Sequence, residues 1–480
     1  MLGAPSLIQF AHAFGQRYDL PIPLWIFVFG GAAVVLASFA LIARTATGKP
    51  APVVADETHL SALKPVTAAI SFAALIALVL YGTLGSQEVA ENIVPTIFWL
   101  LVWIVVPLSC GILGDWTQSL NPFAGIARLT GRASFRQKIL ARTLPLPWPA
   151  KLGWWAAAVL YAALACGELI FNQTAVLPAF TAWALAVYFV ASTLMGLLFG
   201  EAWLRKGEVF TVLFSTWGRL GYWRFGAGGS KGFAGGLRIP FEASASRVAF
   251  VLMLLVSVNF DGLLATHAWT KVSDRYAASA GSGSALFHVY IVCTFLAVIL
   301  VIWALFAGFA RASALAAQFK LGRYAALAGL LPSLLPIAFG YLLAHNLEYI
   351  IVNGQLLFPL IGNPAGAENW PLHLPYPFND SYEPRTHLLP SGFYWYVAVA
   401  AIIAVHVVAV LLAHRHLARS TRKAYAGRAE YPWLAAMVAY TMFSLWLLAQ
   451  PLVQERAVAG EAGMVTPGVT QPATDPGKNT

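Results

Sequence analysis

Ten apolar stretches of about 20 residues recur along the chain, and this is the length that an α-helix needs to cross the hydrocarbon core of a bilayer. They occupy residues 24–43, 66–84, 95–114, 153–172, 179–199, 247–265, 288–309, 325–349, 394–414 and 432–450. Hydrophobic residues make up 59% of the 480 positions and charged residues only 10%, which is unlike the composition of a water-soluble globule. The sequence therefore predicts an all-α fold, a polytopic integral membrane bundle of about ten transmembrane helices.

The basic residues are distributed unevenly between alternate loops. One set of loops contains 24 of the 30 Lys and Arg residues, and it comprises 44–65, 115–152, 200–247, 310–324 and 415–431. Because cytoplasmic loops retain Lys and Arg, this asymmetry predicts that both termini lie on the outer side of the membrane. The net charge of +10 is then explained by the lipid bilayer, and we expect no nucleic acid as a partner.

The chain divides into a membrane domain and two flanking segments. Residues 1–23 form an extracytoplasmic N-terminal segment without an evident cleavable signal peptide. The membrane domain covers 24–450 and includes a Gly-rich cytoplasmic loop at 200–247 and a long outer loop at 353–393. Residues 451–480 are polar, and we expect them to form a disordered tail.

Ionisable residues gather at helix ends that are predicted to face outward. The segment AHNLEYIIVNGQ closes one span with His345 and Glu348, and SVNFDGLLATHAW closes another with Asp261 and His267. His12 precedes the first span on the same predicted side. An unpaired charge inside a bilayer is costly, so these groups should be paired, bound to a metal or in contact with water. One shared site would satisfy all of them.

The residue types suit a metal-assisted hydrolase. Imidazole and carboxylate groups are ligands for zinc, iron or manganese, and a divalent metal with an open position activates bound water. The metal ligands in this interpretation are His345, His267 and His12. Glu348 is a ligand or the general base, and Asp261 is a ligand or orients one. A hydrogen-bonded network or a solute pathway explains the same residues without a metal, as do scattered interfacial positions.

Further polar residues lie on the same predicted side. Glu168 is near the end of the fourth span, and His288 opens the seventh. The outer loop adds His373, Asp380, Glu383 and His387. This loop follows the span that carries His345, so its polar side chains are candidates for the same site, although ordinary surface polarity also explains them.

Four segments resemble one known family. AHAFGQRYDLPIPLWIFVFGGAAVVLASF, GDWTQSLNPF, SVNFDGLLATHAW and LLPIAFGYLLAHNLEYIIVNGQLL are similar to segments of the bacterial polytopic membrane proteins named fenitrothion hydrolase. The resemblance implies a hydrolase of the bacterial cytoplasmic (inner) membrane, as one subunit of a complex or alone, that cleaves the aryl ester bond of an organophosphorus triester. It supplies no catalytic residues, so the site above rests on the positions of the polar residues.

Three functions therefore remain open. The first is a membrane-embedded organophosphate hydrolase with an outward-facing site for a small-molecule substrate. The second is a transporter or channel for a small or apolar solute, in which the same groups line a proton or solute path. The third is a non-catalytic subunit that holds a partner membrane subunit.

Overall fold

A computed structural model describes residues 24–45, 64–226, 228–318, 322, 324–420 and 426–463. These residues form an all-α fold without strands, in which nine helical segments are long and apolar enough to cross a membrane. The segments are α1 (Leu24–Thr45), α2 (Pro65–Leu84), the continuous α3–η1–α4 (Ile93–Pro95, Thr96–Val105, Val106–Leu113), α9 (Pro178–Phe199), α12 (Ala245–Leu264), α14 (Ala285–Ala316), α15 (Ala325–Asn353), α17 (Ser391–Ser420) and α18 (Ala426–Gly463). The all-α polytopic fold predicted from the sequence is confirmed.

The fourth predicted span is a shorter helix than expected. The apolar stretch at 153–172 forms α7 (Trp155–Leu169), which has 15 residues and is followed after a break by α8 (Asn172–Ala175). At 1.5 Å per residue α7 is about 22 Å long, less than the hydrocarbon core of a bilayer. The structure therefore contains nine candidate spans of full length among the described residues, together with α7.

Short elements join the spans at both ends of the bundle. One end holds α8, α13 (His267–Ala280), η4 (Gly354–Leu356) and α16 (Leu357–Gly362). The opposite end holds η2 (Thr117–Ser119), α5 (Pro122–Thr130), α6 (Ala133–Leu140), α10 (Glu201–Lys206) and η3 (Gly235–Arg238). We call these the outer and inner ends, after the orientation predicted from the basic residues.

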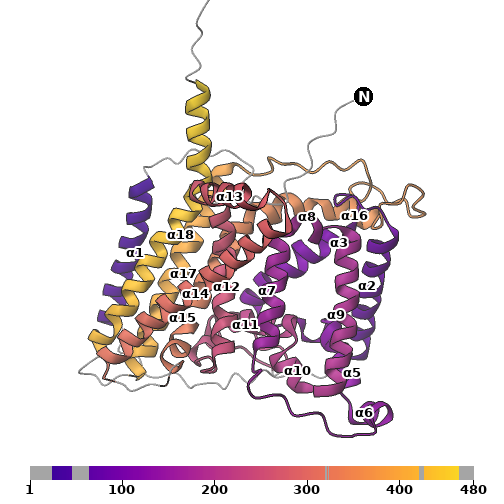
Figure 1. Cartoon of the computed structure of the whole chain (residues 1–480), viewed down its shortest axis with the longest axis horizontal. Coiled ribbons are helices and arrows are strands. Elements are labelled where there is room, and N and C mark those ends of the chain that lie inside the picture. The colour runs from indigo at the N-terminus through magenta and orange to yellow at the C-terminus, as the bar shows by residue number, and fades with distance from the viewer. Residues whose placement is uncertain are drawn as a thin grey trace, which may run out of the picture.

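The most deeply buried helices lie in the centre of the bundle. Figure 1 shows α1, α14, α17 and α18 toward one side, α2 and α9 toward the other, and α7, α11 (Val209–Gly218) and α12 between them. Helices α12 and α15 are buried along most of their length, whereas α2, α9 and α14 are buried along about a quarter of theirs or less. Most side chains on α12 and α15 are therefore enclosed by protein, whereas most side chains on α2, α9 and α14 are not.

A buried half-helix occupies part of the predicted Gly-rich cytoplasmic loop. Within 200–247, α11 (Val209–Gly218) packs against α4 and α7, and nine of its ten residues are buried. It begins where the Glu208 carboxylate accepts hydrogen bonds from the backbone N–H groups of Phe210 and Thr211, a typical N-terminal cap. The segment therefore contributes to the interior of the bundle as well as to its inner surface.

The third span contains a ten-residue π-helix, η1. Its ladder of hydrogen bonds spans five residues, as in the bond from the Val106 N–H to the Leu101 carbonyl. Pro107, which follows, has no N–H to donate to the Trp103 carbonyl, so an ordinary α-helical bond is lost at this point. Trp99 and Trp103 are buried on this segment, and their rings lie 6.4 Å apart.

Candidate functional site

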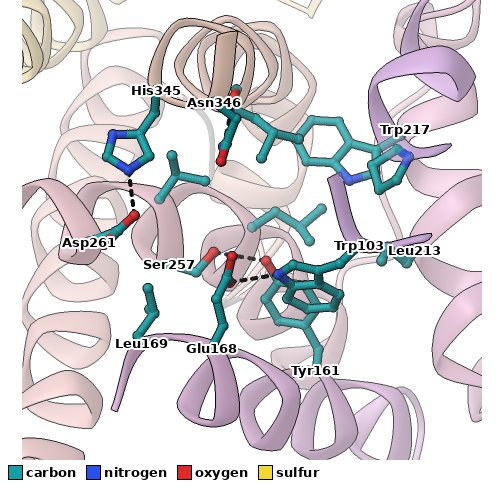
Figure 2. Close-up of a pocket in the computed structure, with 14 residues that line it drawn as sticks. Trp103, Tyr161, Glu168, Leu169, Leu213, Trp217, Ser257, Asp261, His345 and Asn346 are labelled. Atoms are coloured by element: carbon teal, nitrogen blue, oxygen red, sulfur yellow. Dashed lines mark hydrogen bonds and ion pairs between the residues drawn. The ribbon is translucent and has the colours of Figure 1, made fainter. Parts of the chain in front are cut away.

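A small polar cavity lies where η1, α4, α7, α11, α12 and α15 meet. Its volume is about 30 Å³, which is room for one or two water molecules. The polar groups that line it include Glu168, Ser257, Asp261, His345 and Asn346 (Figure 2). Apolar and aromatic side chains form the rest of the wall, among them Leu213 and Trp217 of α11. We call this the His345 cavity.

The centre of the site is a contact between α12 and α15. The Nε2 atom of His345 is within hydrogen-bond distance of the Oδ2 atom of Asp261 (Figure 2). The side chain of His345 is 12% exposed and that of Asp261 is 28% exposed. One turn earlier on α15, Tyr341 stacks nearly parallel to the imidazole at 6.4 Å. The ring is thus held between a carboxylate and an aromatic face.

A second carboxylate enters from the end of α7. The indole Nε1–H of Trp103 donates to Glu168 Oε2 at 2.6 Å, and this is the one hydrogen bond that the Glu168 carboxylate makes with the described residues. Trp103 also stacks on Tyr161 at 5.3 Å, and the Tyr161 hydroxyl lies 2.8 Å from the Ser257 hydroxyl. Glu168 interacts electrostatically with both Asp261 and His345. The second carboxylate therefore lines the same water-sized space as the contact between His345 and Asp261.

A different buried carboxylate lies at the inner end of α11. Glu208 is fully buried and accepts five hydrogen bonds: from the Tyr188 hydroxyl (2.7 Å), the Asn121 amide (2.8 Å), the Thr211 hydroxyl (2.5 Å), and the N–H groups of Phe210 and Thr211. Because each oxygen has at least two donors, this network fixes the start of α11. We call it the Glu208 network.

The structure brings together some of the residues predicted from the sequence. Asp261 and His345 are in contact, and Glu168 lies beside them. Glu348 is 8% exposed, does not line the His345 cavity and interacts electrostatically with Tyr394 of α17. His267 is exposed at the first position of α13. His12 lies outside the described residues.

The outer loop forms a separate hollow rather than the wall of the His345 cavity. His373 and Asp380 line a space of about 780 Å³ together with Glu91 and Glu368. His288 lies elsewhere, stacked on Phe171 at 5.1 Å. These residues, which the sequence offered as candidates for one outer site, thus lie in different places.

The donor set around His345 does not amount to a metal centre within the part of the chain that the structure describes. No three His, Cys, Asp or Glu side chains there are arranged to hold a metal ion. His345 and Asp261 supply two donors, but they bind each other. A zinc, iron or manganese site would need a donor from elsewhere, for which His12 is the residue named from the sequence.

Several residues of the cavity have no signal in the sequence. Trp103, Tyr161 and Trp217 belong to a chain with 17 Trp and 17 Tyr residues, so aromatic type does not single them out. Ser257 is one polar residue in a span, where a hydroxyl usually bonds to its own helix. Among the residues of the cavity that were not assigned a role from the sequence, only Glu168 has a signal, because it is an acidic residue in an apolar stretch.

Comparison of the chain with protein-family models, curated proteins and solved structures found no match. The protein is a multi-pass helical membrane protein, and its function must be argued from the site.

Proposed function

We propose that this protein binds and releases a proton at His345, Asp261 and Glu168, and that it couples this step to the movement of a solute across the membrane. The observation that supports the proposal is the contact of one imidazole with one carboxylate, beside a second carboxylate, around a cavity large enough for water alone. Ionisable groups buried between membrane helices commonly mark proton relays, because their burial is too costly to be retained without use.

The apolar residues of α11 separate this proton site from the inner end of the bundle, which is consistent with a barrier to protons and solutes there. Leu213 and Trp217 line the His345 cavity, while the first residues of α11 belong to the Glu208 network. Both side chains are 2% exposed. A proton or solute that reached His345 from outside would therefore meet a buried apolar helix before reaching the inner end.

Proton flux into liposomes tests the proposal. We expect the purified protein, reconstituted with a pH-sensitive dye inside, to admit protons under a membrane potential faster than empty liposomes do. His345→Gln and Asp261→Asn should each slow the flux at least tenfold. Asp274→Asn, which removes an exposed carboxylate on α13, is the matched control. Flux in the site variants equal to wild type would exclude this role.

Hydrolysis is the second candidate, favoured by the same contact and by the resemblance to the proteins named fenitrothion hydrolase. An imidazole that is oriented by a carboxylate can take a proton from a water molecule in the adjacent cavity. The cavity of about 30 Å³ has no room for a phosphotriester, so this function requires the helices around it to separate. For that reason we rank it below proton coupling.

Two measurements decide on the second candidate. Release of the phenol from fenitrothion by purified protein, lost in His345→Gln, would support hydrolysis. Elemental analysis of the same preparation tests the divalent metal. A metal present at close to one equivalent and lost in His345→Ala and Glu348→Ala would support a metal-assisted reaction. The absence of turnover in folded, lipid-reconstituted protein would exclude hydrolysis of this substrate.

A further inference from the structure

A second small cavity lies at the inner end of the bundle and is lined by cationic side chains. Its volume is about 40 Å³. Arg238 reaches it from η3, and Arg415, His416 and Arg419 reach it from the end of α17. Among the described residues no Asp or Glu lines this cavity. We call these four residues and the space between them the basic pocket.

One wall of the basic pocket is held in place by a proline in α15. Pro332 has no N–H, so the Ala328 carbonyl four residues earlier loses its helical partner. The N–H of Phe241 donates to this carbonyl at 3.2 Å and fastens the segment after η3 to α15. The Arg219 guanidinium donates to the Gly236 carbonyl at 2.8 and 3.0 Å and fastens the same segment from the other side. Arg238 is therefore presented by an anchored segment.

The opposite wall depends on a close approach between α15 and α17. A Cβ atom at Gly329 would lie 2.5 Å from Nε2 of His416, so only glycine leaves room for the imidazole there. Glu430 of α18 has the carboxylate nearest in sequence to the arginines of α17. It is paired with His414, at 2.9 Å. Arg415 and Arg419, four residues apart, share one face of α17.

The three arginines of the basic pocket have no partner of opposite charge among the described residues. Arg238, Arg415 and Arg419 make no hydrogen bond or ion pair with any residue that the structure describes. In the sequence, the stretches 319–323 before α15 and 421–425 after α17 contain four Lys or Arg residues and no Asp or Glu. An arginine pocket without carboxylates suits the charge and the acceptor oxygens of a phosphate group.

We propose that the basic pocket binds the phosphate group of an anionic phospholipid. The pocket is formed between membrane helices and lies at their end, where lipid headgroups are found, and basic pockets in this position bind phosphorylated headgroups. The site is separate from the His345 cavity, so the proposal does not depend on the function proposed above.

Lipid binding to delipidated protein tests the proposal. Native mass spectrometry would compare phosphatidylglycerol with zwitterionic phosphatidylcholine for the wild type and for Arg415→Gln/Arg419→Gln. We expect preferential binding of phosphatidylglycerol by the wild type, weakened about fivefold for each arginine removed. Arg142→Gln, an exposed arginine at the inner end outside the pocket, should bind like the wild type.

Three results would overturn the proposal. These are equal binding of the two lipids, unchanged phosphatidylglycerol binding by the double variant, and displacement of the lipid by millimolar inorganic phosphate, which would assign the pocket to a free anion. Gly329→Ala provides an independent check, because the added methyl group must move His416. It should lower phosphatidylglycerol binding while the helical circular dichroism stays unchanged.

Discussion

The Glu208 network and the His345 cavity both place carboxylates inside the bundle, but these carboxylates differ in the number of hydrogen bonds that they accept. Glu208 accepts five hydrogen bonds, whereas Glu168 accepts one, from Trp103, within the described residues. Asp261 contacts a single imidazole. Many donors hold a carboxylate in one position and serve structure, while a carboxylate with few donors beside an imidazole suits the proton binding proposed above. This difference distinguishes the Glu208 network, which fixes the start of α11, from the His345 cavity, where we expect a proton to bind.

The largest effect should come from Glu208→Ala. The change removes the cap of α11 and leaves the Tyr188, Asn121 and Thr211 donors unsatisfied, so we expect a loss of about 3 kcal/mol in the free energy of unfolding. Denaturation in mixed detergent, followed by circular dichroism, would measure it. Glu201→Ala, at a side chain 73% exposed, is the control and should have little effect. Wild-type stability of Glu208→Ala would contradict a structural role.

A double-mutant cycle on the His345 cavity should give the next largest effect, in activity rather than stability. If the contact between His345 and Asp261 acts as a unit, His345→Gln/Asp261→Asn should reduce proton flux by the same factor of about ten or more as either single change. Additive losses would indicate two independent roles. The unfolding transition of each variant, measured alongside, should stay closer to wild type than that of Glu208→Ala.

Trp103→Phe should reduce proton flux by a smaller factor, about threefold. Phenylalanine keeps much of the stacking on Tyr161 but removes the indole N–H that binds Glu168, and one hydrogen bond contributes about 1 kcal/mol. Trp99→Phe on the same π-helix is the matched control, since Trp99 does not line the cavity. An equal effect of both changes would point to a general packing defect of η1.

The smallest effect concerns the carboxylate of Asp115, at the inner end. Burial raises the pKa of Asp115, although hydrogen bonds from Thr117 and Gln118 oppose the shift. A raised folded-state pKa favours the protonated form, so the stabilising contribution of Asp115 is complete below about pH 4 and is lost as the pH rises through the folded-state value. The free energy of unfolding of Asp115→Asn, relative to that of the wild type, should therefore increase as the pH rises from 4 to 8.

Unfolding measured at several pH values checks the prediction for Asp115, with Asp274→Asn as the control for removing an exposed carboxylate. A stability difference that is constant with pH would show that three hydrogen bonds compensate burial here. Asp115 would then resemble Glu208 rather than the carboxylates of the His345 cavity.

The sequence predicted the helices better than their contacts. Spans of 18 residues or more are visible as apolar runs, because the bilayer demands both length and composition. A search for stretches of about 20 residues misses α11, which has ten residues and is buried by protein rather than lipid. The same search placed α7 within a longer span than it forms.

The site was predictable only in part. Asp261 and His345 were named because ionisable groups in a span need partners, and the structure places them in contact. Spacing along α15 also suggested Glu348 as a member of the same site. A buried helix touches neighbours on every side, however. His345 contacts α12, whereas Glu348, three residues later on α15, interacts with Tyr394 of α17. The role of Glu348, like those of His267 and His12, stays a prediction.

The π-helix in the third span has a consequence for how this protein tolerates insertions and deletions. Residues 96–105 hold more residues per turn than an α-helix, so the deletion of one residue would let the stretch relax to α-helical winding. Every side chain on one side of the deletion would then turn by about 100° relative to the other. A deletion between Trp99 and Trp103 would take Trp99 out of register with Trp103 and with α4, which packs against α11, while the apolar length needed to cross the membrane would hardly change.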